Sequence, residues 1–189
     1  MDDAAAIGAC EKYNARACAE GWLSACDATL DFHRVEFRVL IATWRSFATH
    51  HLPSRKDFTP RSLKALQRNV AIYERVVNGH VRYCVRTMGT AFSDVMGDVT
   101  GKFLDEVMPA EYLASWHGAL DTVLEAGTPL RFVSRAGTFG KPVLVGEFFE
   151  APILTDEGSP SMVLSAGLFA PRHWADVTAN ESMRQVAAA

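Results

Sequence analysis

The stretch YCVRTMGTAFSDVMGDVTGKFLDEV, from Tyr83 to Val107, raises the first question about how this chain folds. It begins with the alternating pattern of a strand, and glycines then interrupt its apolar pattern at Gly89, Gly97 and Gly101. Glycine is favoured where a backbone turns tightly with a positive φ. The spacing of these glycines matches neither G-x-G-x-x-G nor the P-loop, which excludes a phosphate cradle. We therefore expect a strand followed by two short helices, the second capped by Thr100.

Strand-like and helical patterns flank this stretch on both sides. Asn78-Gly79 separates two strand-like runs, near 70–77 and 80–88, which is a strong hairpin signal. Pro109 is expected to start a helix that runs to about Ala126 and ends at Gly127. Further strand candidates follow at 129–139, 142–154 and 161–170, and the short loops between them favour a meander. These patterns predict an α+β fold.

The first 50 residues are predicted to be mainly helical. Residues 4–28 are rich in alanine, and we expect one weakly amphipathic helix there. A second helix is expected from a cap at Asp31 to about His51. Its predicted apolar stripe consists of Phe32, Val35, Val39, Leu40, Trp44 and Phe47.

Three of the four cysteines, Cys10, Cys18 and Cys26, lie in the predicted first helix. Neighbours spaced by eight on one helix lie about 12 Å apart, too far for a shared metal or a disulfide. We therefore expect reduced thiols that pack as small apolar groups.

Composition narrows the class of protein. The chain has 189 residues and a net charge of −3, so no basic field points to nucleic acid. No apolar run approaches the ~20 residues that span a bilayer. The first residues lack the basic start and apolar core of a signal peptide. We expect a cytoplasmic protein with one domain and one hydrophobic core.

Three local motifs resemble those of a PAS domain, and in particular the stand-alone bacterial PAS-like family with an N-terminal helical extension. Trp44 and the following LPSRKDFTP are similar to the family's W…P-x-R-x-D-x-x-P. VRYCVRTMGTAF is similar to its fRYrlxGT strand, and MGDVTGKFLDEV is similar to its G-x-D-x-T-G-x-x-L-x-E turn and helix. The resemblance covers roughly residues 34–172.

The resemblance implies a PAS-like fold: a five-stranded antiparallel sheet cupped by short helices and one long helix, with N-terminal helices in front. The strand at 81–88 would be central in that sheet. Residues 1–30 would form an N-terminal helical arm, residues 31–172 the PAS-like domain, and residues 173–189 a C-terminal tail.

Such domains commonly hold a small ligand between sheet and helices. The candidate ligand-binding residues that would face this cup are Tyr83, Val85, Trp116, His117, Phe132 and Phe148. The Tyr83 hydroxyl could meet a ligand or bond to a neighbour in the core. A haem cofactor through His117 is one possibility, and a histidine at the edge of the core is the alternative. A flavin photoadduct would need a cysteine in the helical connectors, and residues 91–126 contain none.

Catalytic patterns are not evident. Glu147 and Glu150 are three apart on a predicted strand and therefore point to opposite faces. No hydrolase, zinc-protease, EF-hand or kinase motif occurs in the sequence. Arg131 is expected to be solvated. Arg82 and Arg86 could pair with acids of the N-terminal helix, such as Glu36, or with a partner chain. We expect no enzyme.

The predicted function is a sensory or regulatory module that binds an unidentified small molecule, a signalling partner protein, or both. It would dimerise through its N-terminal helices, as PAS-like domains often do. A ligand-free structural adaptor and a small enzyme that uses the cup are the alternatives. A cavity of about 300 Å³ or more would favour a ligand. A core filled by Tyr83, Trp116, Phe132 and Phe148 would favour the adaptor.

Overall fold

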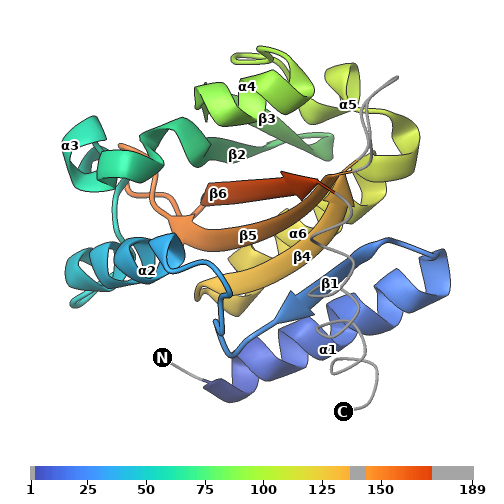
Figure 1. Cartoon of the computed structure of the whole chain (residues 1–189), viewed down its shortest axis with the longest axis horizontal. Coiled ribbons are helices and arrows are strands. Elements are labelled where there is room, and N and C mark those ends of the chain that lie inside the picture. The colour runs from blue at the N-terminus through green and yellow to red at the C-terminus, as the bar shows by residue number, and fades with distance from the viewer. Residues whose placement is uncertain (1–2, 137–143, 172–189) are drawn as a thin grey trace.

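The computed structural model of the chain describes residues 3–136 and 144–171 (Figure 1). Its strands form one antiparallel sheet in the order β1-β4-β5-β6-β2-β3. The strands are β1 (Ser24–Asp27), β2 (Val70–Asn78), β3 (His80–Met88), β4 (Leu130–Ala136), β5 (Leu144–Ile153) and β6 (Met162–Pro171). The α-helices are α1 (Asp3–Glu20), α2 (Glu36–Phe47), α3 (Pro60–Leu63), α4 (Thr90–Met96), α5 (Leu104–Val107) and α6 (Ala110–Ala126). Two 3₁₀-helices are η1 (Arg55–Asp57) and η2 (Lys64–Asn69).

The sheet is buried on both faces, which divides the core into two clusters. One cluster packs residues of α1, α4 and α6 against the sheet, and Phe148 of β5 belongs to it. The other packs residues of α2 and the segment before β2 against the opposite face, and Phe149 belongs to it. Successive strand residues point to opposite faces, so adjacent phenylalanines serve both clusters.

The five predicted strands are confirmed as β2 to β6. Gly79, with a φ of +76°, makes the predicted turn between β2 and β3. The expected central place of β3 is wrong, because β6 pairs with β2 and leaves β3 at the edge of the sheet. The loop after α4 covers part of this edge, where the Val85 N–H donates to the Lys102 carbonyl at 2.9 Å.

The predicted helix over residues 4–28 is wrong in its second half. α1 ends at Glu20, and Gly21 follows in the left-handed region with a φ of +68°. The chain then reverses into β1, a sixth strand that pairs with β4. On the other side of β1, the Asn14 side chain donates to the Cys26 carbonyl at 2.9 Å and accepts from the Cys26 N–H at 2.8 Å.

This reversal also corrects the expected separation of the cysteines. Cys10 of α1 and Cys26 of β1 are both buried in the same core cluster. Burial, with the Cys10 thiol as the second cause, raises the pKa of Cys26 well above its usual value. All four cysteines are free thiols, as expected.

The helix α2 begins at Glu36, so the predicted cap at Asp31 is wrong. Its buried face consists of Phe37, Leu40, Ile41 and Trp44. Val35 and Val39, predicted to be buried, are 64% and 51% exposed. They lie on the opposite side of the helix from Phe37 and Ile41.

The stretch quoted first folds as the end of β3 followed by the two short helices α4 and α5, as predicted. Gly97 and Gly101 have φ values of +82° and +83°, which explains both glycines. The predicted cap at Thr100 is wrong, because α5 begins at Leu104. The Glu106 carboxylate instead reaches back to accept the Phe103 N–H at 3.3 Å.

Two further predictions concern membranes and the tail. None of the helices within residues 3–136 and 144–171 combines the length and the apolar character needed to cross a membrane. The tail predicted for residues 173–189 lies outside the described residues.

Candidate functional site

The six predicted ligand-binding residues come from four elements. Tyr83 and Val85 lie on β3, Trp116 and His117 on α6, Phe132 on β4 and Phe148 on β5. The Trp116 and Phe148 rings pack edge to face with their centroids 5.8 Å apart. The Tyr83 and His117 rings do so at 5.2 Å. Five of these residues belong to one core cluster, and His117 packs against it through Tyr83.

Tyr83 and His117 belong to a polar group between β3 and α6. The Tyr83 hydroxyl donates to the Asp121 carboxylate at 2.6 Å, and Arg75 forms an ion pair with Asp121 at 3.8 Å. Burial, together with the Asp121 carboxylate, raises the pKa of Tyr83, so this hydroxyl stays protonated. Burial lowers the pKa of His117, whose Nε2 is buried without a hydrogen-bond partner among the described residues.

A buried acid, Glu150, lies beside Phe132 and Phe148 of this cluster and was not predicted as a site residue. It is 4% exposed, and its Oε1 accepts from the Ser165 hydroxyl at 2.8 Å. Its Oε2 and the Tyr73 hydroxyl are both buried without a partner in the part of the chain that the structure describes. Burial raises the pKa of Glu150 to about 8, so the carboxyl is mainly neutral at pH 7. The signal was a glutamate on the same strand face as Phe148, in an apolar run.

The cavity beside Glu150 is small. Its volume is about 20 Å³, and Trp116, Phe132 and Phe148 line it. That is room for about one water molecule. The Trp116 and Phe148 rings pack against each other beside this cavity, and Tyr83 packs on His117, so neither place leaves room for a group as large as a haem or a flavin. The residues as folded therefore do not fit either cofactor.

Charged residues on the other face of the sheet form structural pairs. Arg131, predicted to be solvated, is 3% exposed and bonds to Glu147 at 2.8 Å and to Asp27 at 3.1 Å. It is buried because β1 and the turn before α2 cover it. Glu147 and Glu150 point to opposite faces, as predicted.

The sequence suggested Glu36 as a partner for the arginines of β3, but the structure pairs them with other acids. Arg82 bonds to Asp105 and Glu106 of α5, and Arg86 bonds to Glu74 of β2. Glu36 pairs with Arg34 instead. Within residues 3–136 and 144–171, no three histidine, cysteine or acidic side chains are arranged to hold a metal.

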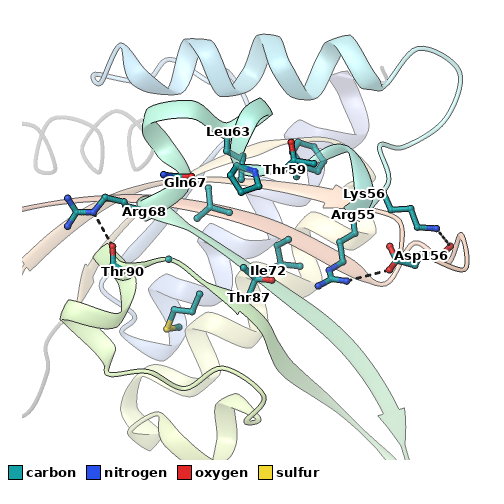
Figure 2. Close-up of a pocket in the computed structure, with 15 residues that line it drawn as sticks. Arg55, Lys56, Thr59, Leu63, Gln67, Arg68, Ile72, Thr87, Thr90 and Asp156 are labelled. Atoms are coloured by element: carbon teal, nitrogen blue, oxygen red, sulfur yellow. Dashed lines mark hydrogen bonds and ion pairs between the residues drawn. The ribbon is translucent and has the colours of Figure 1, made fainter.

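A larger groove lies outside the cup, where η1, α3 and η2 meet the ends of β2 and β3 (Figure 2). Its volume is about 560 Å³. The floor is apolar and consists of the buried residues Phe58, Val70 and Ile72. The half-buried Leu63 and exposed polar residues surround this floor, among them Gln67, Arg68, Thr87 and Thr90.

Three cations line this groove. Arg55 forms an ion pair with Asp156 at 3.4 Å, and the Lys56 ammonium donates to the Asp156 carbonyl at 3.4 Å. Arg68, which Figure 2 shows at the other end, donates to the Thr90 hydroxyl at 3.0 Å. Sequence reasoning missed the groove because its walls come from segments far apart in the chain.

Comparison with known proteins finds one matching family model and several similar solved structures. A family model described as PAS domain matches residues 33–168. Similar solved structures are a light-oxygen-voltage domain studied with a flavin analogue and the light state of the blue-light photoreceptor Aureochrome1 LOV. The first is 15% identical over 66% of this chain and 93% of that chain, with a TM-score of 0.49. The second is 12% identical over 65% of this chain and 96% of that chain, with a TM-score of 0.43.

A third similar structure is an RNA-binding light-oxygen-voltage receptor. It is 16% identical over 66% of this chain and 35% of that chain, with a TM-score of 0.43. No curated protein matches the chain.

Proposed function

Because the chain belongs to the PAS domain family, we propose that it is a regulatory module that passes a signal through contact with a partner protein. PAS domains generally act as sensory modules and are typically not catalysts. In this proposal the domain recognises a partner on its surface, and the partner carries the output.

The observation that carries this proposal is the packing of the cup. Tyr83, Phe132 and Phe148 are each at most 3% exposed, and the cavity beside Phe132 and Phe148 holds about 20 Å³. A ligand pocket usually needs about 300 Å³ or more. This packing supports recognition at the surface over a large chromophore inside.

A small ligand inside the cup remains part of the proposal at the cavity beside Glu150. The free Oε2 of Glu150 and the hydroxyl of Tyr73 offer unmet hydrogen-bonding capacity inside the cup. Only a group of about the size of water would reach them without repacking. The ligand-free adaptor is the second candidate, and the same aromatic packing favours it.

The homodimer also stays a proposal. The buried face of α1 consists of Ala6, Cys10, Tyr13 and Ala17, and it packs on the chain's own core. A dimer through this helix would therefore use its other face, where Ile7 is 52% exposed.

The test begins with the chain purified from its own organism. We expect native mass spectrometry to find no flavin or haem mass, and the absorption spectrum to lack bands above 350 nm, roughly where these cofactors absorb. Each co-purifying protein is then reconstituted with the pure chain, and we expect at least one direct complex by light scattering. A bound chromophore, or the absence of any direct complex, would contradict the proposal.

A further inference from the structure

We propose that the outer groove of Figure 2 binds an extended, acidic segment of a partner protein that carries apolar residues between its carboxylates. This inference rests on the proposed function, because it names the surface and the chemistry of the partner contact. Nothing in the cup enters it.

Charge selects an acidic occupant. Arg55, Lys56 and Arg68 line the groove with one carboxylate, Asp156, so its net charge is 3 − 1 = +2. The whole chain carries −3. A positive groove on a negative protein attracts acidic segments and repels basic ones. The Arg68 guanidinium is directed to a neutral hydroxyl, that of Thr90, which leaves its charge available to a carboxylate.

The floor selects apolar residues between those carboxylates. Phe58, Val70 and Ile72 are 8%, 2% and 4% exposed, and they form a floor beneath exposed threonines. Apolar side chains that enter the groove would remove further area from water. Rim groups such as Gln67 and Thr87 can bond to the backbone of a bound segment.

The placement of the cations favours a segment over a small anion. Figure 2 shows Arg68 at one end of the groove and Lys56 at the other, with Ile72 between them. A single small anion would meet one end only. In an extended segment, residues i and i+2 share one face, so two apolar side chains can enter the floor while acidic residues reach both ends.

The walls are built to keep their shape. The Asp57 carboxylate accepts the Ser54 N–H at 2.8 Å, and the Arg55 N–H donates to the Leu154 carbonyl at 2.9 Å. At the other end, Gly89 lies so close to η2 that an added Cβ would be 2.4 Å from the Arg68 carbonyl. A preformed groove costs less conformational entropy on binding.

The experiment uses fluorescein-labelled synthetic peptides of seven residues and the full chain. The probe peptide has two glutamates at each end and Leu-Ser-Leu between them. One control replaces both leucines by serine, and another replaces the glutamates by lysine. By fluorescence polarisation, we expect the probe to bind at least about tenfold more tightly than either control. Its affinity should fall as salt rises.

Two variants test the two halves of the argument. Arg68→Glu should weaken probe binding about tenfold or more, whereas Arg61→Glu, an equal charge reversal outside the groove lining, should change it less than about twofold. Thr87→Trp should block the floor without a change in charge, and Val77→Trp is its control on an exposed strand position. Circular dichroism confirms that all four variants fold.

Several outcomes would overturn the inference. They are equal effects of Arg68→Glu and Arg61→Glu, equal binding of the serine control, no binding of the probe, or tighter binding of a labelled single-stranded RNA. If a partner found by reconstitution binds the Arg68→Glu and Thr87→Trp variants as tightly as it binds the unchanged chain, the inference about the groove is wrong and the proposed regulatory function stands. If no partner exists but the groove binds the probe as expected, the proposed function fails by itself.

Discussion

The Tyr83 hydroxyl donates to the Asp121 carboxylate at 2.6 Å and so links the edge strand β3 to the long helix α6. A hydrogen bond to a charged group contributes about 1.5–3 kcal/mol. We expect Tyr83→Phe to lower the free energy of unfolding by about 1–2 kcal/mol in urea denaturation, since the half-exposed carboxylate regains some water. Tyr112→Phe is the control, because no described hydrogen bond involves its hydroxyl. Equal losses in both variants would contradict the assigned role.

Glu150 should make stability depend on pH in an unusual direction. Its pKa is about 8 in the folded chain and near the ordinary glutamate value when unfolded. As the pH rises, the unfolded chain therefore loses this proton at a lower pH than the folded chain. The contribution of Glu150 to the free energy of unfolding is full below about pH 4.5 and declines as the pH rises to about 8. We expect Glu150→Gln to flatten this decline in thermal unfolding measured from pH 5 to 8.5. An unchanged slope would show that Glu150 ionises normally.

Arg131 holds two acids from separate parts of the chain, so its removal should be costly. We expect Arg131→Ala to lower the free energy of unfolding by about 3–5 kcal/mol, because Glu147 would stay buried without its cation. Arg16→Ala removes an exposed pair with Glu20 and a contact of the guanidinium with the Trp22 ring, and it should cost about 1 kcal/mol or less. Denaturant titration of both variants makes the comparison. A small effect of Arg131→Ala would mean that water reaches this site.

Two glycines on helices should respond oppositely to alanine. At Gly118 of α6, an added Cβ would lie 2.9 Å from the Trp22 ring, so Gly118→Ala should destabilise the fold by about 1–3 kcal/mol. At Gly8 of α1, nothing lies within 4 Å, and Gly8→Ala should stabilise it by about 0.5–1 kcal/mol. Melting temperatures report both signs. A loss at Gly8 would refute the open surface assigned there.

The thiols should differ in their access to alkylating agents. Cys18 is exposed, whereas Cys10, Cys26 and Cys84 are buried. Because the reactive species is the thiolate, burial and a raised pKa slow the reaction of Cys26 further. We expect iodoacetamide at pH 7.5 to modify Cys18 alone within minutes, as peptide mass spectrometry would show. The other three should react only in urea.

Local patterns were enough to predict the strands β2 to β6 and the helix α6. The Asn78-Gly79 turn and the helix end at Gly127 are properties of neighbouring residues, and both are confirmed. β1 was missed because Ser24–Asp27 has little strand character of its own and depends on pairing with β4. The edge place of β3 was missed for a related reason, since the order of strands is set by distant pairings.

In the candidate site too, features set by neighbouring residues were predictable, and features set by distant residues were not. The sequence pattern was sufficient to collect Tyr83, Trp116 and Phe148 in one core cluster, and their role toward a ligand stays a prediction. Burial of Arg131 depends on Asp27, which lies more than a hundred positions away. The outer groove joins Arg55, Thr87 and Asp156, and no window along the chain contains all three.

Asn14 has a consequence for how the sheet ends. A strand at the border of a sheet offers unpaired backbone groups to any other chain, which favours aggregation. At Cys26 both of these groups are already bonded to one side-chain amide, which imitates a single residue of a further strand. At this point of the border the backbone of β1 is therefore already occupied, which disfavours the addition of a strand from another copy at Cys26.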